Sequence, residues 1–124
     1  MKKPIEIVFL KEAEDYHQEL PEKIKKKFLF SFYKVKNGYK GEWFKKLKDS
    51  DGIFEFKERG LDKFYRIFAF WDKTLESKVL IIGTHGINKK SNKTPKKEIE
   101  KAEKIKRLYF NNKPKDKNGT YNTR

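Results

Sequence analysis

Three strand-like segments follow one another closely between residues 53 and 84, and this succession constrains the fold more than any other feature of the sequence. Residues 53–59 alternate apolar and charged side chains, residues 63–71 are rich in aromatic side chains, and residues 78–84 contain the apolar run Val-Leu-Ile-Ile. These patterns are typical of β-strands. Because short turn-like segments, 60–62 and 72–77, separate them, the sequence predicts a three-strand meander in hairpin succession.

The residues before the meander predict one further strand and two helices. Residues 5–10 are almost all apolar, which is typical of a strand covered on both faces. A short helix is expected over residues 11–18, and a second helix begins near Pro21 and stops at Asn37-Gly38. The second helix carries an apolar stripe at helical spacing, formed by Ile24, Phe28, Phe32 and Val35. No regular element is assigned to residues 41–47.

The residues after the meander predict a closing helix and a tail. Thr94 is the expected N-cap and Pro95 the expected first helical residue of a helix that runs to about Tyr109. Its inward-facing residues are expected to be Ile99, Ala102, Ile105 and either Leu108 or Tyr109. Residues 1–110 are therefore expected to form one domain, followed by a flexible basic tail at 111–124.

The expected order is β-α-α-β-β-β-α. It describes an α+β fold in which a small, mostly antiparallel sheet packs against the N-terminal helices and a C-terminal helix. The length of 124 residues suits one domain and excludes a multidomain enzyme.

Positive charge dominates the composition. The chain has 32 Lys and Arg against 18 Asp and Glu, a net charge of +14, which favours a polyanionic partner such as nucleic acid or an anionic membrane. Residues 86–124 alone contribute 13 basic against 4 acidic residues, so much of the charge is concentrated in the last third. Since 28 of the basic residues are Lys, a compositional bias with a merely solvated surface is the alternative.

Several kinds of site and location are excluded by what the sequence lacks. Without cysteine there is no disulfide scaffold, thiol nucleophile or cysteine-ligated zinc, and only His17 and His85 offer imidazole chemistry. No metal or other cofactor is therefore expected. The apolar segment 5–10 is too short for a signal peptide, and no run approaches the ~18 apolar residues of a membrane span. A cytoplasmic location is expected.

A charged residue in the middle of an aromatic strand is the first candidate for function. Arg66 lies within Phe-Tyr-Arg-Ile-Phe-Ala-Phe, where a guanidinium needs a partner or a ligand. One interpretation is a buried pair with Glu55 across the hairpin. In the other, Lys57 and Arg59, which share a strand face with Glu55, line a groove together with Arg66. A solvent-exposed strand face remains open for Glu55, Lys57 and Arg59 taken alone.

The segment between the meander and the last helix is the second candidate. Residues 84–95 place His85 and three lysines, Lys89, Lys90 and Lys93, ahead of a helix N-terminus. Exposed backbone N–H groups and the helix dipole favour a phosphate at such a position, and lysine side chains reinforce them. His85 is interpreted either as a general acid or base or as a strand-end histidine satisfied by a backbone hydrogen bond.

The order and spacing of four segments resemble a known toxin family. Residues 51–57 (Asp-Gly-Ile-Phe-Glu-Phe-Lys), 64–67 (Phe-Tyr-Arg-Ile), 85–95 with its Lys-Lys and Lys-Thr-Pro, and 98–102 together resemble the phage-derived, HigB-like branch of the RelE/HigB toxin superfamily. The resemblance implies a RelE-like fold. It also implies the toxin of a type II toxin–antitoxin pair, an endoribonuclease that cuts mRNA on the ribosome. The implied partner is a helix-turn-helix antitoxin.

The resemblance also implies roles for individual residues. Cleavage without metal requires attack of an RNA 2′-OH on the adjacent phosphate, stabilisation of the phosphate oxygens and assistance to the leaving oxygen. Arg66 matches an arginine expected at the scissile phosphate, and Lys57 stands where the family has arginine, which removes a bidentate fork. The implied catalytic set is Arg66, Lys57, Lys90 and His85. The expected RNA-binding set is Arg59, Lys89, Lys93, Lys96 and Lys97, of which Lys89 and Lys93 match the family's Lys-Lys and Lys-Thr-Pro positions.

Two other classes of function stay open. Some members of this superfold poison DNA gyrase through protein contact, and fold alone does not separate the two activities. A non-catalytic nucleic-acid-binding module would use the same positive charge simply to coat phosphates. A membrane-surface role is disfavoured because the basic tail lacks the aliphatic residues of an amphipathic anchor.

Overall fold

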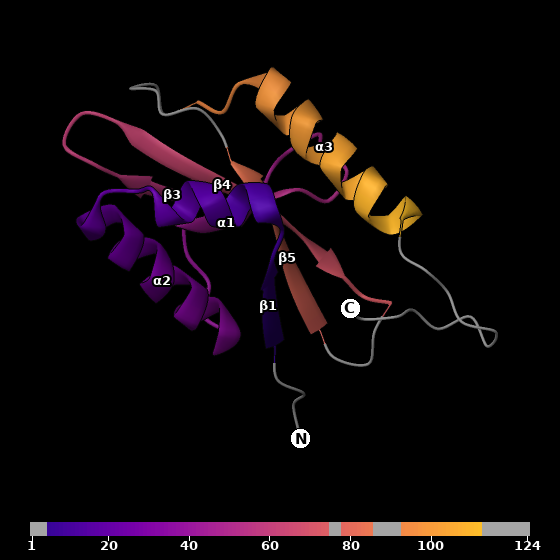
Figure 1. The fold of residues 1–124 in the computed structure, drawn as a ribbon, viewed down its shortest axis with the longest axis horizontal. Coiled ribbons are helices and arrows are strands. Elements are labelled where there is room, and N and C mark those ends of the chain that lie inside the picture. Colours follow the sequence, from indigo (N-terminus) through magenta and orange to yellow (C-terminus); the bar gives the residue numbers. More distant parts are fainter. Residues whose placement is uncertain (1–4, 75–77, 86–92, 113–124) are drawn as a thin grey trace.

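The computed structural model describes residues 5–74, 78–85 and 93–112, and these form one mixed sheet flanked by helices (Figure 1). The strands are β1 (Ile5–Phe9), β2 (Phe44–Lys46), β3 (Phe54–Arg59), β4 (Phe64–Asp72) and β5 (Lys78–His85). Their order across the sheet is β1-β5-β4-β3-β2. β1 pairs with β5 in parallel, whereas β2, β3, β4 and β5 pair antiparallel, so the predicted meander is confirmed.

Helices cover both faces of this sheet. α1 (Lys11–Gln18) and α2 (Glu22–Lys36) pack on one face, and α3 (Lys96–Asn111) packs on the other (Figure 1). The α+β class with a closing C-terminal helix is therefore confirmed. Among the helices that the structure describes, none is both long and apolar enough to cross a membrane.

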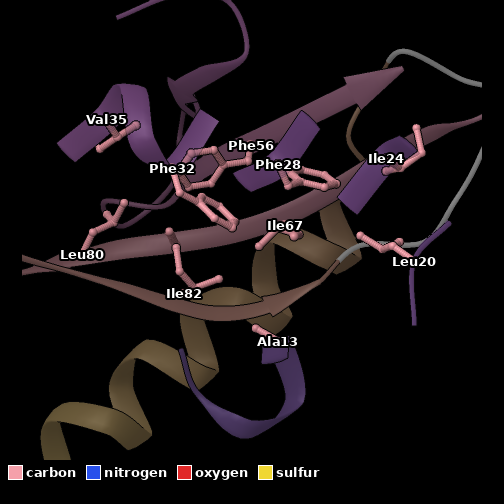
Figure 2. Packing of buried hydrophobic residues seen from close by; sticks show 11 residues of the cluster. Ala13, Leu20, Ile24, Phe28, Phe32, Val35, Phe56, Ile67, Leu80 and Ile82 are labelled. Atoms are coloured by element: carbon pink, nitrogen blue, oxygen red, sulfur yellow. The ribbon is translucent and has the colours of Figure 1, made fainter. Parts of the chain in front are cut away.

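The face under α2 holds the larger hydrophobic cluster. The predicted stripe of α2, formed by Ile24, Phe28, Phe32 and Val35, is buried against the sheet (Figure 2). Phe32 meets Phe56 of β3 edge to face with ring centroids 4.8 Å apart. Ile67 of β4 and Ile82 of β5 complete the facing layer. A helical period of 3.6 residues explains why this stripe is predictable from the sequence.

The face under α3 holds a second cluster. Phe68 and Phe70 of β4 and Ile81 of β5 are buried there against Ala102, with Tyr109 packed alongside. Leu108 is exposed, so Tyr109 is the inward residue of the two that the sequence left open. Because β4 and β5 contribute side chains to both clusters, they are the central strands of a three-layer arrangement.

The sequence prediction omits one strand, and the last helix ends two residues beyond Tyr109. Residues 44–46 form the edge strand β2, paired with Phe54–Phe56, where the sequence predicts no regular element. Three residues are too few to show a strand period, which explains the omission. α3 extends to Asn111, the first residue of the expected tail, and residues 113–124 lie outside the described residues.

The predicted cap of the last helix is also wrong. Pro95 occupies the N-cap position of α3, and helical residues begin at Lys96. The hydroxyl of Thr94 donates its hydrogen bond to the carboxylate of Glu55 instead of to the helix backbone. Thr94 therefore ties the start of α3 to β3.

Candidate nucleic-acid interface

Five side chains from β3 and β4 share the sheet face on which α3 packs. They are Glu55, Lys57 and Arg59 of β3 and Phe64 and Arg66 of β4, and we call this set the meander face. In the antiparallel register Lys57 lies opposite Arg66, and Arg59 lies opposite Phe64. The alternate residues of both strands, such as Phe56 and Ile67, pack under α2. Strand alternation thus directs the charged residues to one side and the apolar residues to the other.

The centre of the meander face is a buried ion pair. The Nε atom of Arg66 lies 3.1 Å from Oε2 of Glu55, and their side chains are 0% and 1% exposed. The same carboxylate accepts the hydrogen bond from Thr94. A buried charge without a partner is costly, so the pair explains how Arg66 is tolerated in an aromatic strand. The pair with Glu55 that the sequence offered as one interpretation is confirmed.

The burial of Arg66 changes what it can do in this conformation. With no exposed surface, its guanidinium does not present itself to an external phosphate. Lys57 is only half-buried and Arg59 is exposed, so these two side chains form the accessible positive charge above the pair.

The surroundings of Lys57 lower the pKa of its amine. Its pKa is lowered from 10.5, mainly by burial, and the charges of Lys45 and Arg66 add to the lowering while those of Glu55 and Glu42 oppose it. A lowered pKa increases the fraction of neutral amine near physiological pH. Such an amine can accept a proton from a hydroxyl and return it to a leaving group.

Phe64 lies between the cations of the meander face. Its ring centroid is 5.7 Å from Nζ of Lys57, 5.8 Å from Cζ of Arg59 and 5.7 Å from Cζ of Arg66. These distances are at the outer edge of cation–π contact. The meander face therefore combines positive charge with a half-buried aromatic ring.

The start of α3 brings further lysines towards the meander face. Thr94 is bonded to Glu55, and the exposed residues Lys93, Lys96 and Lys97 lie within three residues of Thr94 in the sequence. These are three of the residues that the resemblance implies in RNA binding. Lys89 and Lys90, which it also implies, lie outside the described residues.

The structure places His85 on the other side of the sheet. Phe68 pairs with Thr84 whereas Ala69 pairs with Ile82, so Gly83 is an extra residue in β5 and the alternation shifts by one. His85 consequently lies opposite Ile67, which packs under α2. Arg66 and His85 therefore project from opposite faces.

The surroundings of His85 are those of a partly buried neutral imidazole. Its ring stacks on Tyr16 of α1 with centroids 4.2 Å apart, and Nδ1 lies 3.6 Å from Oε1 of Glu12. Burial, helped by the charge of Lys101, lowers the pKa of His85 below 6.5, although Glu12 and Glu98 oppose this. Glu12 also accepts hydrogen bonds from Thr84 and Lys101, so this cluster joins α1, β5 and α3.

Two residues near the site are missing from the sequence prediction. Phe64 precedes Arg66 by two residues, so strand alternation already places both on one face, and this signal is present in the sequence. Lys45 lies opposite Glu55 on β2, a strand that the sequence does not predict. Within the described part of the chain, no group of three His, Cys, Asp or Glu residues is placed to hold a metal ion.

The comparison with protein families identifies the kind of protein that carries this site. The sequence model of the family described as "Phage derived protein Gp49-like (DUF891)" matches residues 15–107, three quarters of the chain. No curated protein and no solved structure matches the chain. The matched span includes α2, the whole meander face and most of α3. The Gp49-like family is associated with the toxins of toxin–antitoxin systems. The chain therefore belongs to the Gp49-like family of phage-derived proteins, within the RelE/HigB-like toxin superfamily.

Proposed function

We propose that this protein is a HigB-like toxin that cuts mRNA on the ribosome in the cytoplasm, and that a helix-turn-helix antitoxin neutralises it. Membership of a toxin-associated family supports the general role. The observation that carries the enzymatic role is the lowered pKa of the half-buried Lys57. This residue lies opposite Arg66 of the buried Glu55–Arg66 pair. A module that only coats phosphates has no need of an amine with a lowered pKa.

The proposed reaction is an internal transfer at phosphorus. The 2′-oxygen of the RNA attacks the adjacent phosphate, a new P–O bond forms, and the bond to the 5′-oxygen of the next nucleotide breaks. Neutral Lys57 accepts the 2′-OH proton, and its ammonium form returns a proton to the leaving 5′-oxygen. The products are a 2′,3′-cyclic phosphate and a 5′-hydroxyl. The reaction needs no cofactor for its atom balance.

The other residues of the meander face bind and orient the RNA in this proposal. Arg59 is exposed and contacts the backbone, together with Lys93, Lys96 and Lys97 at the start of α3. Buried Arg66 adds positive charge beneath the phosphate, whereas the lowered pKa of Lys57 comes mainly from its own burial. Direct contact of Arg66 with the scissile phosphate requires movement of the side chains that bury it.

The proposal assigns proton transfer to Lys57 and not to His85. His85 lies on the opposite face of the sheet from Lys57, and its ring stacks on Tyr16. Both observations favour a structural role in which His85 links α1 to β5. Lys90 and Lys89 remain predicted as catalytic and RNA-binding residues respectively, on the resemblance and on their place ahead of a helix N-terminus.

Expression in bacteria with mapping of mRNA 5′ ends tests this function. The wild-type chain is compared with Lys57→Met and Arg66→Ala, and with Lys26→Met as a matched control because Lys26 is exposed on α2, on the opposite face. We expect growth arrest and new 5′ ends inside translated messages for wild type and Lys26→Met, and loss of both for Lys57→Met and Arg66→Ala.

Other outcomes point to the other classes of function. Growth arrest without mRNA cuts favours a protein-contact poison of the gyrase type. The absence of arrest, together with strong RNA binding by the purified protein, favours a non-catalytic module. Either outcome contradicts the proposed ribonuclease.

A further inference from the structure

Phe64 is an aromatic residue that the hydrophobic core does not use. Phe56 and Phe68, its aromatic neighbours on the meander strands, are 0% and 1% exposed and belong to the two core clusters. Among the described residues, Phe64 belongs to neither cluster and has no ring–ring contact. Tyr65, the next residue, turns to the opposite face and packs under α2. Core packing therefore does not account for Phe64.

The neighbours of Phe64 are cations instead. Lys57, Arg59 and Arg66 lie 5.7–5.8 Å from the ring centroid, which is the outer limit for cation–π contact. The cations thus lie near the ring but are not in close contact with it. Arg59 is exposed and lies directly across from Phe64, so it can leave the ring for a phosphate when a ligand arrives.

A half-buried ring beside backbone-binding cations has the properties of a nucleobase platform. Proteins that hold single-stranded nucleic acids stack bases on aromatic side chains while positive groups follow the phosphates. We propose that Phe64 stacks one base of the bound RNA, next to the phosphate that Arg59 contacts. This inference rests on the proposed function, since it names how the same face orients its RNA.

Binding of two probes by purified protein tests the platform. One probe is a short single-stranded RNA containing 2-aminopurine, whose fluorescence is quenched by stacking, and the other is polyphosphate, which has charge but no base. Phe64→Leu removes the ring, Phe64→Met is a second ring-free variant in case the first fails to fold, and Phe64→Tyr keeps the ring. Thermal unfolding checks that each variant is folded.

We expect the ring-free variants to bind the RNA about tenfold more weakly and to lose the quenching. Phe64→Tyr should bind like the wild type, and the affinity for polyphosphate should be the same for all variants. Equal RNA binding by wild type and the ring-free variants overturns the inference. A parallel loss of polyphosphate binding in the ring-free variants also overturns the inference, because the ring then acts only through the cations. Failure of the wild type to bind the RNA overturns it as well.

The two proposals fail in distinguishable ways. If mRNA cuts depend on Lys57 but RNA binding does not depend on the ring of Phe64, only the platform is wrong. If ring-dependent RNA binding is present but no mRNA is cut, the ribonuclease function is wrong and the platform belongs to a binding protein.

Discussion

Replacing Arg66 by methionine removes one member of the buried ion pair while keeping an unbranched apolar stem in its place. Since the Arg66 and Glu55 side chains are 0% and 1% exposed, the carboxylate of Glu55 loses its countercharge without gaining water. Breaking a buried pair in this way costs about 3–5 kcal/mol. Because Thr94 still donates a hydrogen bond to Glu55, we expect the free energy of unfolding to fall by about 3 kcal/mol.

Urea unfolding followed by circular dichroism measures this loss. A small domain has an m value of roughly 1–3 kcal/mol per molar urea, so the midpoint should fall by roughly 1–3 M. The matched control is the double variant Glu55→Gln/Arg66→Met, in which a neutral amide can still bond to Thr94. With both charges removed, the double variant should lie within about 1 kcal/mol of wild type.

Two results would refute this reasoning. The first is a cost below about 1 kcal/mol for Arg66→Met alone, which would mean that Glu55 needs no countercharge. The second is a double variant as unstable as the single variant, which would mean that Arg66 stabilises the fold by packing and not by its charge. The coupling energy from the complete mutant cycle separates these cases.

Three further predictions concern the core and its titration. Phe28→Ala removes a fully buried ring of α2 and should cost about 3–5 kcal/mol in urea unfolding; a cost below about 1 kcal/mol would contradict the packing. Tyr109→Phe removes the hydrogen bond that the hydroxyl donates to buried Asp72 at 2.6 Å and should cost about 1.5–3 kcal/mol; unchanged stability would show that Asp72 does not depend on it. Burial holds the pKa of His17 below its ordinary value of 6.5, so the unfolded chain takes up more protons and stability should fall as the pH drops from 6.5. His17→Gln should reduce that slope and leave the part due to His85, whose pKa is also lowered by burial; an unchanged slope would contradict the assignment.

Local periodicity made the core predictable. The stripe of α2 that includes Phe28 and Phe32 follows the helical period, and the apolar run of β5 identifies a strand covered on both sides. The structure confirms both predictions because each pattern lies within a single helix or strand. The edge strand β2 is too short to produce such a signal.

The site was predictable only where strand alternation applies. Lys57, Arg59 and Arg66 share a face because residues two apart on a strand do so, whereas the lowered pKa of Lys57 comes mainly from its burial in the tertiary structure. The extra residue at Gly83 turns His85 to the opposite face, and a bulge of this kind leaves no mark in a periodic pattern.

Long-range contacts account for the remaining differences between the sequence predictions and the structure. The sequence leaves open whether Arg66 pairs with Glu55 or awaits a ligand, and the tertiary structure selects the pair. Thr94, which has the signature of a helix cap, instead bonds to a carboxylate 39 residues away. A strong local propensity was overridden here by the need to satisfy a buried charge.

Cleavage of ribosome-bound mRNA by purified protein tests the central claim most directly. The wild type and the Lys26→Met control should produce fragments with a 5′-hydroxyl, at a rate that rises with pH up to the pKa of Lys57, which lies below 10.5. Lys57→Met should reduce this rate roughly 10²- to 10⁴-fold. Cleavage by Lys57→Met at the wild-type rate, or no cleavage by the wild type, would contradict the account.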